Sequence, residues 1–121
     1  MTFTNTPDYE TSTGWPTFEN SYVVLEPMTK HVQQPTKYGL QDSWDCIVWK
    51  YEPTENTLIP YTGIRIFNKR IVGALSLAYK TGNPLAGHVH KGGKNGSAMV
   101  IENDGSPTME VLAKLWQEAN S

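Results

Sequence analysis

Residues 42–67, DSWDCIVWKYEPTENTLIPYTGIRIF, hold two apolar runs separated by a short polar segment. Apolar side chains alternate along the first run, 42–51, so that Trp44 and Val48 share one face of an extended chain. The second run, 58–67, is rich in β-branched and aromatic residues, and the EPTEN segment before it is typical of a turn. The stretch therefore predicts two consecutive β-strands, the first with large apolar groups on both faces.

A further strand is expected before this pair. Residues 21–27, SYVVLEP, are apolar and β-branched and end at a proline. Residues 29–41 hold Pro35 and Gly39 and show no sustained period, which predicts a long loop between the first and second strands, with a short strand continuation as the alternative.

A helix is expected directly after the third strand. Asn68 can accept hydrogen bonds as an N-cap, and apolar residues then recur at helical spacing. Gly82 and Pro84 are stop signals. The segment after them predicts a β-hairpin with strands over 84–90 and 97–103 and the tip KGGKNG between them.

The C-terminal segment has the signals of a second helix. Ser106 stands at the N-cap position, Pro107 at the first helical position and Glu110 in the first turn, and an apolar stripe follows. The expected order is three strands, a helix, two strands and an appended helix. The first six of these elements follow the order of the OB-fold, a five-stranded, partly open Greek-key barrel. The sequence therefore predicts a mainly β protein, an OB-fold barrel with a C-terminal helix.

Length and composition indicate one domain. The 121 residues include 10 Gly and 8 Pro, which suits short strands joined by many turns. Residues 1–20 are polar with scattered aromatics and predict a flexible N-terminal arm, with docking of Trp15 and Phe18 on the barrel as the alternative. The barrel is expected over 21–104 and the docked helix over 105–121. One cysteine rules out an intramolecular disulfide, and no window resembles a secretion signal or a membrane span. We therefore expect a soluble, cytoplasmic protein without a membrane partner.

Charged residues are unevenly distributed along the chain. The formal net charge is −2, but all 12 Asp and Glu lie at or before Glu55 or at or after Glu102. The segment between them is basic and includes six Lys and Arg residues. A basic segment in an acidic protein favours a polyanionic partner.

Aromatic and basic residues fall where an OB-fold binds its ligand, on the second and third strands and on the loops joining strands one to two and four to five. Single-stranded nucleic acid requires both kinds of side chain, because unpaired bases stack on planar groups and cations follow the phosphates. These contacts are common to DNA and RNA, so RNA is not excluded. The helix cations Lys69, Arg70 and Lys80 are expected away from this groove. The predicted binding residues are Lys37, Tyr38, Trp49, Tyr51, Tyr61, Arg65, Phe67, His90, Lys91 and Lys94.

Three other motifs allow a chemical interpretation beside a simpler one. The KGGKNG tip is either a hairpin turn or a phosphate-binding loop, although a P-loop would require a helix after it. His88 and His90 share one face of a strand, which suits a metal-dependent enzyme, but no further histidine follows them. Cys46 is expected to be a buried, inert thiol. We expect no enzyme activity, no cofactor and no metal; a barrel that binds a protein or a small ligand is the alternative function.

Two segments link the chain to a known family. In IFNKRIVGALSL a strand ends in Phe before a helix, and in AMVIENDGSPTMEVLAKLW an apolar strand, an acidic turn and a final helix follow a glycine-rich segment. From Tyr22 to about Trp116 the chain thus resembles the small single-stranded-DNA-binding proteins of tailed bacteriophages, especially those of actinobacterial hosts. It departs from them at Met99, where relatives often have Trp, and in the His-Val-His of residues 88–90.

The resemblance implies binding of single-stranded DNA without strong sequence preference, in support of phage DNA replication or recombination in the host cytoplasm. Phage or host replication proteins are the expected protein partners. An exposed strand edge or the apolar C-terminal helix offers a surface for a homo-oligomer.

Overall fold

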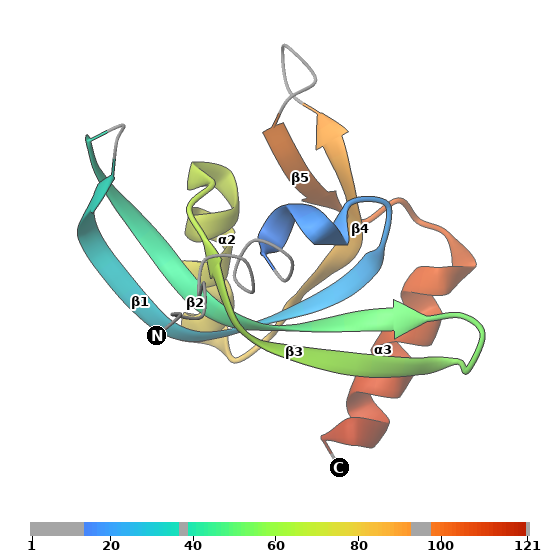
Figure 1. Ribbon diagram of the computed structural model, residues 1–121. Coiled ribbons are helices and arrows are strands. Elements are labelled where there is room, and N and C mark those ends of the chain that lie inside the picture. The colour runs from blue at the N-terminus through green and yellow to red at the C-terminus, as the bar shows by residue number, and fades with distance from the viewer. Residues whose placement is uncertain (1–13, 37–38, 93–97, 121) are drawn as a thin grey trace, which may run out of the picture.

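The protein has a five-stranded antiparallel sheet with strand order β3-β2-β1-β4-β5, and the predicted mainly β class is confirmed. The computed structural model describes residues 14–36, 39–92 and 98–120. In that part of the chain neither α-helix is long and apolar enough to cross a membrane. The elements are the 3-10 helix η1 (Trp15–Phe18), β1 (Tyr22–Thr36), β2 (Gly39–Glu52), β3 (Thr57–Ile66), α2 (Lys69–Thr81), β4 (Leu85–Gly92), β5 (Ala98–Glu102) and α3 (Pro107–Ala119) (Figure 1).

β1 and β2 form a hairpin that extends far beyond the other strands. Their pairing continues to Thr36 opposite Gly39, whereas β4 pairs only with Tyr22–Leu25 of β1. The far half of the hairpin, residues 29–36 and 39–43, has no strand on either side in the described part of the chain. We call this half the arm; it curves away from the sheet beside α2 (Figure 1).

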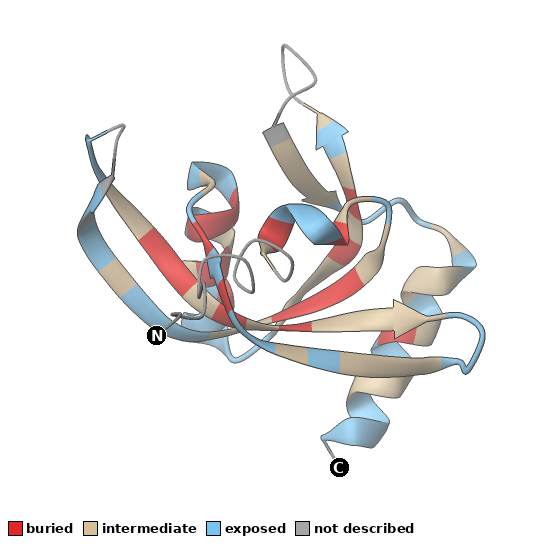
Figure 2. Ribbon diagram, in the orientation of Figure 1, coloured by how far each residue is buried: buried red, intermediate tan, exposed pale blue. Residues whose placement is uncertain are grey.

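The prediction of a long loop is therefore wrong for residues 29–36 and 39–41, and the strand continuation given as the alternative is longer than expected. A strand that packs on a core buries every second side chain, which gives its sequence an alternating apolar pattern. The arm does not pack in this way: Val32 and Leu40 are exposed, and much of this hairpin is coloured as exposed in Figure 2. Its sequence therefore lacks the alternation that identifies a strand. Pro35 is compatible with β1 because the strand has no second neighbour here that would need the missing N–H.

The core lies on the inner face of the sheet, beneath α2 and η1 (Figure 2). Along β2 the buried positions alternate from Trp44, because successive side chains of a strand point to opposite faces. α2 adds its apolar stripe to the same cluster. The cluster consists of Trp15, Phe18, Val23, Leu25, Trp44, Cys46, Val48, Ile64, Ile66, Ile71, Val72, Leu75 and Val89.

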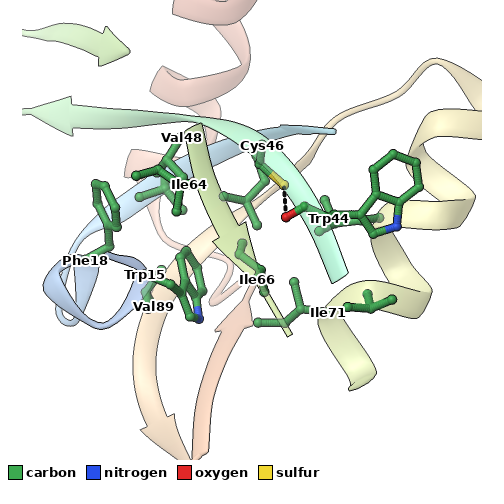
Figure 3. Packing of buried hydrophobic residues seen from close by; sticks show 13 residues of the cluster. Trp15, Phe18, Trp44, Cys46, Val48, Ile64, Ile66, Ile71 and Val89 are labelled. Carbon is green, nitrogen blue, oxygen red and sulfur yellow. Dashed lines mark hydrogen bonds between the residues drawn. The ribbon is translucent and has the colours of Figure 1, made fainter. Parts of the chain in front are cut away.

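η1 inserts two aromatic side chains into this core. Trp15 is 7% exposed and Phe18 3%, and both rings lie among the buried side chains of the strands (Figure 3). The ring of Phe18 meets that of Tyr61 edge-on, with 5.4 Å between centroids. The prediction of a flexible N-terminal arm is thereby corrected for residues 14–20; residues 1–13 lie outside the described residues.

The sheet is not closed into the predicted barrel. β3 and β5 are its two edges, and no pairing joins them in the residues that the structure describes. η1 lies between the two sides, since Phe18 packs against β3 and Glu19 lies 3.8 Å from the ammonium group of Lys91 in β4. Side chains of η1 thus cover an opening that a barrel would close by strand pairing.

α2 begins and ends where the sequence predicts. Asn68 Oδ1 accepts hydrogen bonds from the backbone N–H groups of Arg70 and Ile71, and Gly82 ends the helix in the left-handed region with φ 78°. Asn68 Nδ2 also donates to the backbone oxygen of Met99 at 3.0 Å. The start of α2 is therefore fixed against β5 as well as capped.

α3 packs on the outer face of the sheet. Leu112 is fully buried, and the ring of Trp116 meets that of Trp49 edge-on at 5.6 Å. Ser106 precedes the helix as predicted, but its hydroxyl donates to the hydroxyl of Tyr22 at 3.2 Å and does not cap the helix. The C-terminal segment thus covers the face opposite to α2.

Replacing Gly87→Ala should destabilise the protein, because a Cβ there would lie 2.6 Å from the backbone oxygen of Glu102. Backbone atoms of a paired strand cannot move aside cheaply, so we expect a loss of about 1–3 kcal/mol in the free energy of unfolding, measured by urea denaturation.

Gly73→Ala is the matched control, because a Cβ on this exposed helical residue meets no atom within 4 Å. It should stabilise the protein by about 0.5–1 kcal/mol, since alanine is the better helix former. Equal stability of the two variants would contradict the close packing of β4 on β5.

Candidate functional site

Strand pairing brings acidic side chains to the basic segment. Acidic residues that lie outside the basic segment in the sequence become its neighbours in the folded chain. Asp45 of β2, for example, stands opposite Arg65 of β3. The charge separation along the chain therefore does not become one uniformly basic face. The ion pairs are Arg65–Asp45 at 2.8 Å, His90–Glu102 at 3.1 Å and Lys91–Glu19 at 3.8 Å.

Arg65, a predicted phosphate contact, is part of a cluster on the outer face of β1, β2 and β3. Its Nε donates to Asp45 Oδ1 at 2.8 Å, and His31 Nε2 lies 2.8 Å from Asp45 Oδ2. The hydrogen bond from Arg65 lowers the pKa of Asp45, and the one from His31 adds to this effect. A nucleic acid at this face would meet a guanidinium group already bound to a carboxylate.

Trp49, a predicted binding residue, lies on the outer face of the sheet, where α3 covers it. Its ring packs against Trp116, and its Nε1 donates to Glu26 Oε1 at 3.3 Å. A base could stack on Trp49 only if α3 moved away. This part of the outer sheet surface is therefore occupied by the protein itself.

Two other predicted aromatics also have internal partners. The hydroxyl of Tyr51 donates to Asn56 Oδ1 at 2.8 Å, across the β2–β3 turn. Tyr61, a predicted binding residue, packs instead against the core beside Phe18. A register shift between Cys46 and Val48 changes which residues of β3 face inward. Lys37, Tyr38 and Lys94 lie outside the described residues.

A cleft of about 540 Å³ lies between the arm and α2, and we call it the arm–helix cleft. Phe67, which follows β3, lines it and is 36% exposed. Lys30 of the arm and Lys69 at the start of α2 also line it, and in the described part of the chain neither forms an ion pair. The described lining residues are Lys30, Gln33, Leu40, Gln41, Asp42, Phe67, Lys69, Val72, Gly73 and Ser76.

The set of predicted binding residues does not include Lys30 or Lys69, although Lys30 lies in the predicted ligand loop between strands one and two. Lys30 falls in a segment expected to be a loop, and Lys69 belongs to the helix expected to lie away from the groove. The sequence does contain one signal for this site. In the Phe67-Asn68-Lys69 run an aromatic residue and a cation lie on either side of a helix cap, and both are side chains that bind nucleic acid. Only the arm, however, places Lys30 opposite them.

The wall of the cleft is held in shape by Asp42. Its Oδ1 accepts a hydrogen bond from the backbone N–H of Gln33 at 2.9 Å. Gln33 has a left-handed backbone, with φ 50°, and lies within the irregularity between His31 and Gln34 in the β1–β2 pairing. The Asp42 side chain thus stabilises the bend of the arm over α2.

A second cluster of ionisable side chains lies on the outer face of β1, β4 and β5. The ring of Tyr22 lies 4.7 Å from that of His88, which in turn lies 5.9 Å from that of His90. Hydrogen bonds to the backbone oxygen of Lys91 and to Glu102 raise the pKa of His90. His90, a predicted phosphate contact, is thus already paired with a carboxylate.

The described part of the chain holds neither a cluster of metal-binding side chains nor a reactive thiol. No group of three or more His, Cys, Asp and Glu side chains lies there in a position to hold a metal ion. Burial raises the pKa of the Cys46 thiol to about 12, so the reactive thiolate is scarce at neutral pH.

Asp104 makes the stability of the fold depend on pH. Hydrogen bonds from Tyr22 and Ser106 lower its pKa from 3.8 to about 2, so the carboxylate stabilises the folded protein above about pH 4 and this contribution is lost towards about pH 2. Asp104→Asn should therefore lower the Tm near neutral pH, and the difference from wild type should disappear at the acid end, as followed by circular dichroism.

Tyr22→Phe removes the main hydrogen-bond donor to Asp104 and should reduce the same Tm difference. A difference between wild type and Asp104→Asn that stays constant down to about pH 2 would contradict this assignment.

Comparison with known proteins gives no relative. No protein-family model matches the chain, and neither does any curated protein or solved structure. The location of a binding site therefore has to rest on the residues of the chain and their geometry.

Proposed function

We propose that this protein binds single-stranded DNA, without strong sequence preference, and that the strand enters the arm–helix cleft. A base stacks on Phe67, and Lys30 and Lys69 neutralise the phosphates on either side. Stacking accepts any base because every base has a π face, and lysine contacts to phosphates carry no sequence information.

One observation carries this proposal: an exposed aromatic residue lines the same cleft as two lysines that have no acidic partner among the described residues. Elsewhere in the described residues the predicted contacts have competing partners, with Arg65 bound to Asp45 and His90 to Glu102. A phosphate at those positions would have to displace a carboxylate, whereas at Lys30 and Lys69 it would displace water and counterions.

The strand order supports the proposal that the fold is an OB-fold opened between β3 and β5. A five-stranded barrel of this class, cut between those strands, has the order β3-β2-β1-β4-β5 that the sheet has. In OB-folds the connection between the first two strands lies beside the ligand. The arm is that connection, and it forms one wall of the cleft.

The biological role proposed for the chain rests on its resemblance to phage single-stranded-DNA-binding proteins. It would protect single strands during phage replication or recombination in the cytoplasm of an infected cell, alongside phage or host replication proteins. A protein-binding role is the second candidate, because Leu77 and Tyr79 of α2 are 63% and 61% exposed.

Lys30→Gln and Lys69→Gln should each weaken the binding of a fluorescein-labelled oligo-dT, measured by anisotropy over a range of salt concentrations. Each substitution removes one phosphate contact, so the slope of log affinity against log salt should become shallower by roughly 0.7 per lysine. Lys114→Gln, on exposed α3, is the matched control and should leave affinity and slope unchanged.

Wild-type protein that shows no affinity for oligo-dT at low salt would contradict the proposed function. An unchanged slope in both cleft variants would instead show that the strand binds elsewhere. Matched RNA and duplex DNA, titrated in parallel, test the preference for single-stranded DNA.

Phe67→Ala should weaken oligo-dT binding by about 1–3 kcal/mol, the value of one stacked base, while the salt slope stays as in wild type because no charge is lost. Tyr79→Ala removes a more exposed ring from α2 that does not line the cleft, and it should have little effect on affinity. Equal losses in the two variants would point away from the cleft as the stacking site.

A further inference from the structure

Asp42 is an unexpected side chain in a cleft proposed to bind a polyanion. Of the described residues that line the arm–helix cleft, it alone carries a carboxylate. Its charge opposes phosphate binding by Lys30 and Lys69. Its hydrogen bond from the Gln33 N–H would be made equally well by the amide oxygen of an asparagine, so the support of the arm does not require the negative charge.

The carboxylate has unused hydrogen-bonding capacity that can face a ligand. Oδ1 accepts one bond, from Gln33, and Oδ2 has no hydrogen-bond partner in the described part of the chain. A carboxylate offers about four acceptor sites on two oxygens, and it binds best to a group that presents two parallel N–H donors.

Among the bases, guanine presents such a pair of donors. Its N1–H and its N2 amino group lie side by side on one edge. Adenine and cytosine place a single amino group next to an acceptor nitrogen, and thymine places its N3–H between two carbonyl oxygens that would repel a carboxylate. The acceptor pair of Asp42 therefore matches guanine better than the other three bases.

We propose that the arm–helix cleft prefers guanine at one position of the bound strand. The guanine ring stacks on Phe67, and Asp42 accepts from N1–H and from the N2 amino group. Gln33, which also lines the cleft, carries a side-chain amide that supplies N–H donors for the guanine O6. This inference rests on the proposed function, and it adds one preferred position to binding that is otherwise tolerant of sequence.

The test uses oligo-dT in which one central residue is replaced by guanine, hypoxanthine, adenine or cytosine, titrated against the full chain by fluorescence anisotropy. Hypoxanthine is guanine without the N2 amino group, so this pair isolates one hydrogen bond to the carboxylate. One bidentate base contact is worth about 1–3 kcal/mol, so the guanine oligonucleotide should bind about fivefold or more tightly than oligo-dT. The hypoxanthine oligonucleotide should lose a large part of that gain.

Asp42→Asn is the informative variant, because its amide oxygen can still accept from Gln33 while its NH₂ group replaces an acceptor with a donor. The preference for guanine should disappear. Asp104→Asn removes the same charge at a residue that does not line the cleft, and it should keep the preference. The pair separates recognition of the base from a general gain in affinity on losing a negative charge.

The two proposals fail in different ways. If no oligonucleotide binds, the proposed function is wrong and this inference falls with it. If the oligonucleotides bind but wild-type protein treats guanine and hypoxanthine alike, the inference is wrong and the proposed function stands. A guanine preference that persists in folded Asp42→Asn protein would also overturn the inference. If that variant does not fold, the comparison of guanine with hypoxanthine in wild-type protein still tests whether the carboxylate binds the N2 amino group.

Discussion

The pairing of β1 with β2 is the interaction on which the rest of the structure depends. Near its start β1 pairs on both sides, with β2 and β4, and places Val23 and Leu25 at the centre of the core. Beyond Leu25 its only strand partner in the described part of the chain is β2, so the hairpin is free to bend over α2. The same strand therefore holds the sheet together at one end and forms a wall of the cleft at the other.

Much of the fold follows from local sequence signals. The alternation over residues 42–51 and the signals at Asn68 and Gly82 identify β2 and the limits of α2, because burial on one face and capping are determined by near neighbours. The arm could not be predicted from local signals, because neither of its faces is consistently buried. The same is true of η1, because a single turn is too short to show a period and gains its stability from tertiary packing.

The candidate site depends on contacts that no local pattern contains. The basic segment between Glu55 and Glu102 is conspicuous in the sequence, but antiparallel pairing places Asp45 beside Arg65 and Glu102 beside His90. Of the predicted binding residues that the structure describes, Phe67 lies in the arm–helix cleft. The lysines that join it there come from the arm and from the start of α2, segments whose proximity only the folded chain reveals.

A single measurement tests most directly whether the cleft is the binding surface. Amide and side-chain chemical shifts of isotopically labelled protein can be followed by NMR during titration with oligo-dT. Binding in the cleft predicts the largest changes at Lys30, Leu40, Phe67 and along the first turns of α2, with small changes around Trp49 and α3. Changes concentrated on the outer face around Trp49 and Arg65, or no changes at all, would contradict it.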